Sequence, residues 1–176
     1  KSNLLNNWRW YLKLANGNEI IDYKNRIIKD IIYNDDDTLS TEIIMAIDEN
    51  LLDKRNELLY ENIYPFLKIP QTQTEVKSYI TMSVDMPKVS TKNYFFKDMV
   101  ITINTIVHED KMKMPKIYSA TRADYIASLI NKIFNQNKNY GNVPLEYVSD
   151  IESIILNKYF VRTLRFRCNE LNKMRC

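Results

Sequence analysis

The spacing of apolar residues changes at Pro70, and this change constrains the fold more than any other feature. Before Pro70, apolar residues recur at intervals of three and four residues, which is typical of helices with one buried face. After Pro70 they begin to alternate with polar residues, which is the period of a β-strand with one buried face. Helical and strand periods in separate blocks predict an α+β fold, with helices packed on a mostly antiparallel sheet.

The first third of the chain has the helical period. Residues 3–15 and 20–32 each place their apolar side chains along one stripe, and residues 41–52 predict a third, less regular helix. We expect these helices to pack beside the sheet or to reach outward from it. The chain therefore divides into an N-terminal helical arm, residues 1–59, and an α+β domain, residues 60–176.

The remainder of the chain predicts a sheet of about four strands and one central helix. Strands are expected over residues 76–84, 92–108, 145–149 and 159–168, and the first two form an antiparallel hairpin with a long loop. Residues 121–134 have an amphipathic pattern with a polar cap before it, so we expect this helix to cover one face of the sheet.

The composition limits where such a protein can work. A chain of 176 residues with 45% hydrophobic and 27% charged residues can bury one core and is neither disordered nor a membrane protein. No apolar run approaches the ~20 residues that span a bilayer, and the first residues do not form a signal peptide. Two cysteines, Cys168 and Cys176, fit a reducing compartment. We expect synthesis in a cytoplasm and no membrane partner.

Two motifs with acidic residues are candidates for sites of chemistry. His108 precedes Glu109 and Asp110, which could form a base with its orienting group or a metal site, but neighbours on a strand point to opposite faces. The run Asp35–Asp37 resembles the start of a calcium loop but lacks the required glycine, and two isolated glycines cannot build a phosphate loop. We expect no catalytic residue, no metal, no cofactor and no enzymatic activity.

The last predicted strand carries a basic cluster. Arg165 and Arg167 share one face with Tyr159, and basic residues beside aromatic ones can bind single-stranded nucleic acid. Further basic residues in this region are Arg162, Lys173 and Arg175. The net charge of +3 is too small to decide between a nucleic-acid surface and a strand that faces solvent or another subunit.

Four segments, read in order, carry a resemblance to a known class of proteins. They are IYPFLKIPQTQTEVKSYITMSVDM, NYFFKDMVITINTIVHED, ATRADYIASLINKIF and LEYVSDIESIILNKYFVRTLRFRCNEL. Across residues 60–170, this order resembles the small neck proteins of tailed bacteriophages, which include head-tail connector and tail-completion (tail terminator) proteins. The helical region at residues 1–59 matches less well.

The resemblance implies a structural protein of the virion, made in the host cytoplasm, that forms a homo-oligomeric ring between the portal-bearing head and the tail. Its implied partners are other copies of itself, adjacent neck, portal or tail-tube proteins, and DNA in passive contact with the channel. Arg165 and Arg167 would face the lumen or nucleic acid. The expected subunit-interface residues are Tyr64, Phe66, Ile69, Pro70, Gln71, Thr72, Gln73, Thr74, Glu75, Tyr94 and Phe95. The alternative function is a nucleic-acid-binding module that uses the arginine-rich strand.

Overall fold

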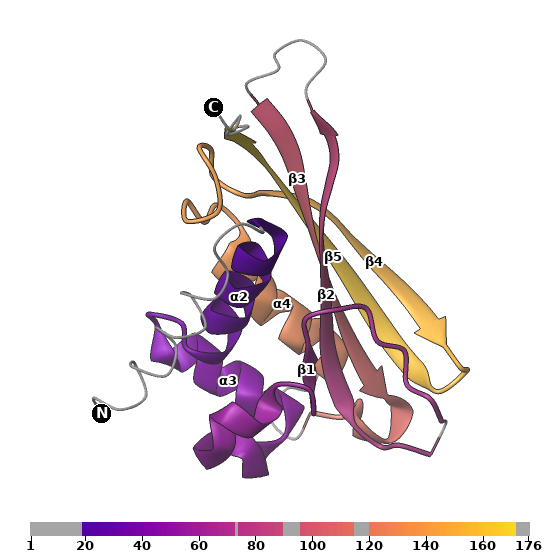
Figure 1. Ribbon diagram of the computed structural model, residues 1–176. Coiled ribbons are helices and arrows are strands. Elements are labelled where there is room, and N and C mark those ends of the chain that lie inside the picture. The colour runs from indigo at the N-terminus through magenta and orange to yellow at the C-terminus, as the bar shows by residue number, and fades with distance from the viewer. Residues whose placement is uncertain (1–18, 73, 90–95, 115–119, 172–176) are drawn as a thin grey trace.

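The computed structural model describes residues 19–72, 74–89, 96–114 and 120–171, and it has the expected α+β fold. Within these ranges one sheet holds five strands in the spatial order β1-β2-β3-β5-β4 (Figure 1). β1 runs parallel to β2, and the other neighbouring pairs are antiparallel. The bounds are β1 Ile63–Tyr64, β2 Ser78–Val89, β3 Phe96–His108, β4 Glu146–Ile155 and β5 Tyr159–Leu171.

Besides small shifts at several strand ends, three differences between the strands and the sequence prediction have a physical reason. β1 was missed because a strand of two residues has no readable period. β2 continues through Pro87, where a loop was predicted, and a register shift between Asp85 and Lys88 accommodates the irregular stretch. β4 runs to Ile155 rather than ending at Ser149, because most of its residues are exposed on both faces and so do not alternate.

The helices lie on one side of the sheet (Figure 1). The third predicted helix begins earlier than expected, because the side chain of Asp36 accepts a hydrogen bond from the Thr38 N–H at 3.1 Å and caps it. It also ends earlier, because Asp48 caps the 3-10 helix that follows. The helical elements are α2 Glu19–Ile32, α3 Asp37–Ile47, η1 Glu49–Leu58, η2 Glu109–Lys111 and α4 Arg122–Phe134. The helix expected at residues 3–15 lies outside the described residues.

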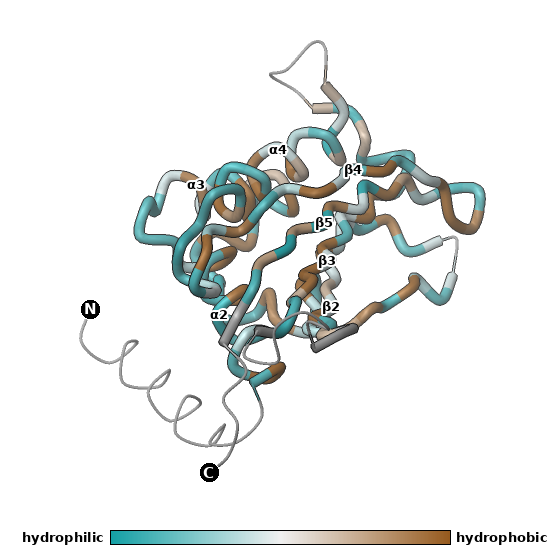
Figure 2. Tube along the Cα trace, turned by 90° about the horizontal axis from the view of Figure 1, so that it is seen from above, coloured by the Kyte–Doolittle hydropathy of each residue, from teal (hydrophilic) through white to brown (hydrophobic). Residues whose placement is uncertain are grey.

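The main core lies between these helices and the sheet. Side chains from α2 and α3 pack with α4 and the inner faces of β2, β3 and β5, so of the two arrangements expected for the N-terminal helices, packing beside the sheet is the one observed. Along much of β2, β3 and β5, hydrophobic and hydrophilic residues alternate (Figure 2). The predicted helix at 121–134 is confirmed as α4, with Leu129 and Ile130 fully buried. Thr121 and Asp124 form a capping box that begins it.

A second, smaller apolar cluster lies on the opposite face of the sheet. It contains Tyr64, Tyr79, Ile106, Tyr159 and Val161. Residues 65–76, which we call the crossing segment, run from β1 over this face as far as β5 and return to β2. The Tyr159 hydroxyl donates to the main-chain oxygens of Thr72, at 3.0 Å, and Glu75, at 2.6 Å.

Candidate functional site

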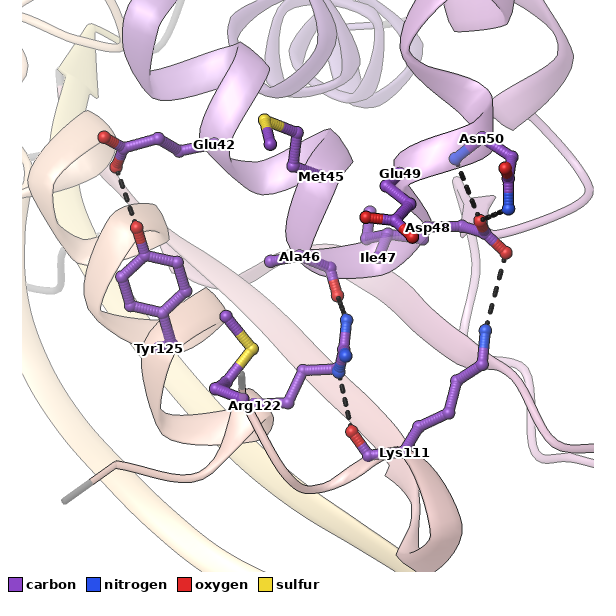
Figure 3. A pocket seen from close by; sticks show the side chains of 11 residues that line it. Glu42, Met45, Ala46, Ile47, Asp48, Glu49, Asn50, Lys111, Arg122 and Tyr125 are labelled. Atoms are coloured by element: carbon purple, nitrogen blue, oxygen red, sulfur yellow. Dashed lines mark hydrogen bonds and ion pairs between the residues drawn. The ribbon is translucent and has the colours of Figure 1, made fainter. Parts of the chain in front are cut away.

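A pocket of about 510 Å³ opens between the C-terminal end of α3, η1, η2 and the start of α4 (Figure 3). None of its residues was singled out from the sequence, because they come from three separate parts of the chain. Its lining consists of Glu42, Met45, Ala46, Ile47, Asp48, Glu49, Asn50, Lys111, Met114, Arg122 and Tyr125.

Arg122 is the central polar residue of this pocket. Its Nε donates to the Lys111 carbonyl at 2.6 Å, and its Nη1 donates to the Ala46 carbonyl at 2.5 Å. Burial lowers the pKa of the guanidinium, while the nearby carboxylates of Asp48 and Glu49 act in the opposite direction. Arg122 therefore fastens the end of α3 and η2 to the start of α4.

Two further polar pairs lie in the pocket, Asp48 with Lys111 and Glu42 with Tyr125. Burial alone would raise the pKa of Asp48, but hydrogen bonds from Asn50 and the charge of Lys111, 3.4 Å away, lower it. The Tyr125 hydroxyl donates to Glu42 at 3.1 Å, and burial, reinforced by this carboxylate, raises the pKa of Tyr125. These groups form a network that joins the helices. Among the described residues, no group of three or more His, Cys, Asp or Glu side chains could hold a metal ion.

His108 is buried beside the second cluster, against Tyr159. Its ring stands edge-on to the Tyr159 ring, with centroids 5.0 Å apart, and its Nδ1 accepts from the Asp110 N–H at 3.2 Å. The Asp110 carboxylate lies 3.4 Å from the same nitrogen, while Glu109 pairs with Lys158 at 3.2 Å. As predicted, the side chains of His108 and Glu109 do not converge. His108 packs inside the fold, whereas Glu109 pairs with Lys158.

The expected interface residues differ in how far they are exposed to solvent. Two of the expected interface residues, Tyr64 and Pro70, are buried within the chain, so neither side chain is available to a partner. The Tyr64 ring packs against the Tyr79 ring, with centroids 6.2 Å apart. Phe66 and Ile69 are exposed, at 46% and 64%. Of the remaining expected residues, Gln71, Thr72 and Thr74 are exposed, Glu75 is half-buried, and Gln73, Tyr94 and Phe95 lie outside the described residues.

Further exposed apolar side chains, on the crossing segment and on β4, were not predicted from the sequence. Leu67 in the crossing segment is 59% exposed. On β4, the outermost strand, Val148, Ile151 and Ile154 are 53%, 51% and 56% exposed, and Tyr147 is exposed as well. The sequence shows the apolar residues of β4, but it does not show that this strand lies at the edge of the sheet.

The arginines of β5 divide between two faces. Arg162 lies on the helix side, where it binds Asp150 at 2.7 Å, and this hydrogen bond raises the pKa of the guanidinium. Arg165 and Arg167 lie together on the opposite face, as predicted, and both are exposed. Arg167 pairs with Asp98 at 2.8 Å. Lys173 and Arg175 lie outside the described residues.

Comparison with protein families matches residues 24–168 to the model of the YomW family. YomW is a phage-associated family name, and it carries no indication of a place in the virion. No curated protein matches the chain. None of the helices in the described ranges combines the length and the apolar character needed to cross a membrane.

Proposed function

This chain belongs to the YomW family, and we propose that it is a structural virion protein that forms a homo-oligomeric ring in the neck or tail of a tailed bacteriophage. The ring would join the portal-bearing head to the tail and would bind the adjacent neck, portal or tail-tube proteins. The phage-associated family name supports a phage origin. The ring itself is supported by the surface of the chain.

Exposed apolar side chains at two separate places carry this proposal. The crossing segment exposes Phe66, Leu67 and Ile69, and β4 exposes apolar side chains along an open sheet edge. Exposed apolar side chains that gather on an edge strand promote association with other chains unless a partner covers them. Two different surfaces of this kind on one chain favour head-to-tail association, and head-to-tail contacts that close produce a ring.

The first experiment asks whether the purified full chain forms closed particles. We expect mass photometry to show one dominant species of fixed subunit number and negative-stain images to show rings. A monomer at every concentration tested would overturn the proposal.

A second experiment uses charge to separate assembly from folding. Thr72 and Thr74 are exposed in the crossing segment, so replacing both with Asp should leave the circular dichroism spectrum unchanged and abolish ring formation. The matched control is Ser128→Asp, an exposed position on α4, which should not affect assembly. If the doubly substituted chain forms rings at the normal level, the crossing segment has no assembly role.

The alternative function, binding of single-stranded nucleic acid, depends on Arg165 and Arg167. Their shared exposed face favours it, but Asp98 pairs with Arg167, and Glu146 lies opposite Arg167 on β4. These acids reduce the positive potential that phosphate binding requires. Fluorescence anisotropy with a labelled single strand at low and high salt tests this function. Salt-sensitive binding that is lost in Arg165→Ala would support it.

A further inference from the structure

We propose that the outer edge of β4 binds part of the crossing segment of a second copy, its residues 66–71, and that this contact closes the ring. The inference depends on the proposed function, because it names the surfaces through which the subunits of that ring would meet. The segment would add to the sheet as a further strand, using its main-chain groups for affinity and its apolar side chains for fit.

The edge of β4 is the more open of the two sheet edges. β4 pairs with β5 on one side and is the last strand in the sheet order (Figure 1), so among the described residues no strand pairs with its other side. It contains no lysine and no proline, which are the residues that commonly block an edge. Both edges have a register shift, between Tyr147 and Ser149 on β4 and between Asp85 and Lys88 on β2, but only the β2 side carries a proline, Pro87.

The crossing segment has main chain available for such a contact. Residues 66–71 form neither helix nor strand, and the side chains of Leu67 and Ile69 are among the most exposed apolar groups of the described chain. In an extended chain, alternate residues direct their N–H groups to the same side. If Leu67 and Ile69 donate to β4, the missing donor of Pro70 falls on the opposite side, where it does not interrupt the ladder.

Charge favours this occupant over a second β4 strand. β4 contains three acids, Glu146, Asp150 and Glu152, and no basic residue. The single Arg162 of β5 is shared between Asp150 and Glu152, so β4 keeps an excess of acid. Residues 65–72 contain Lys68 and no acid. An antiparallel pair of β4 strands centred on Ile151 would place Asp150 opposite Glu152 twice, and like charges in opposite positions destabilise a sheet. The crossing segment therefore complements β4, and pairing between these two different surfaces is head-to-tail.

Disulfide trapping tests the contact in the full chain. Cys176 is replaced with Ser in all variants, and Cys168 is kept because it is buried. The Ile69→Cys and Ile151→Cys variants are mixed under mild oxidation, and the linked peptides are identified by mass spectrometry. We expect dimers that join position 69 of one copy to position 151 of another. In the control mixture, Met45→Cys on α3 replaces Ile69→Cys and should give no linkage to position 151.

The outcomes separate this inference from the proposed function. Rings that show no 69–151 linkage, or that link 151 to 151, would overturn the contact and leave the ring intact. A chain that forms no oligomer would overturn both. Because a cysteine variant can aggregate, Ile151→Lys with Ile154→Lys provides a second measurement: both sites are exposed, so the chain should stay folded and lose its rings. Normal rings from this folded variant would also refute the contact.

Discussion

The hydroxyl of Tyr159 ties the crossing segment to the sheet, and its removal should loosen that segment without disturbing the core. It lies 3.0 Å from the Thr72 oxygen and 2.6 Å from the Glu75 oxygen. One hydroxyl hydrogen is shared between two acceptors, so Tyr159→Phe removes the equivalent of about one hydrogen bond, or ~1 kcal/mol. The phenyl ring still packs against His108 and Tyr79.

Hydrogen exchange read by mass spectrometry measures this loosening. A loss of ~1 kcal/mol corresponds to about fivefold faster exchange in peptides that cover residues 65–76. The melting temperature should fall by no more than about 2–4 °C, the usual shift per kcal/mol for a chain of this size. Peptides from α4 should exchange as in the unsubstituted protein.

The matched control is Tyr140→Phe. Its hydroxyl donates to Asp30 at 2.8 Å in the main core, so its loss should lower the melting temperature while exchange of the crossing segment stays unchanged. Our reasoning is refuted if Tyr159→Phe lowers the melting temperature but leaves the exchange of residues 65–76 as it was. That result would mean that the hydroxyl stabilises the sheet and does not hold the crossing segment in place.

Three further predictions concern the main core. Leu129→Ala should lower the free energy of unfolding by about 2–5 kcal/mol in urea denaturation, because the side chain is fully buried, and a loss below ~1 kcal/mol would contradict the packing of α4. A Cβ at Gly141 would lie 2.9 Å from the Cys168 Sγ and 3.0 Å from the Asn169 oxygen, so Gly141→Ala should cost about 1–3 kcal/mol. The cost should be smaller in a Cys168→Ala background; equal costs would show that the sulfur is not the obstacle. Burial raises the pKa of the Asp30 carboxyl above 3.8, although the hydrogen bond from Tyr140 acts in the opposite direction. The folded protein therefore binds the carboxyl proton more tightly than the unfolded chain does, and its stability falls as the pH rises above 3.8. Asp30→Asn should therefore raise the melting temperature at pH 7 and lose this advantage below pH 3.8, and a gain that does not vary with pH would refute the charge argument.

Elements with a strong local pattern could be predicted from the sequence. α4 was predicted almost to the residue, because its apolar stripe and its capping residues lie within one short stretch. The hairpin of β2 and β3 was predicted from alternation, and the shared face of Arg165 and Arg167 from their spacing. β4 was predicted too short, because an edge strand exposed on both faces loses the alternation that marks a strand.

The sequence by itself therefore determined the α+β class, the central helix and the sides to which most strand residues point, since these depend on neighbours three or four positions away at most. Only the tertiary structure decided that Tyr64 is buried, that β4 is the open edge and that Arg122 lines a pocket. Each of these depends on contacts between distant parts of the chain, such as the bond from Tyr159 to Thr72, 87 positions earlier. No local pattern encodes such a contact, because it exists only once the sheet has brought the two segments together.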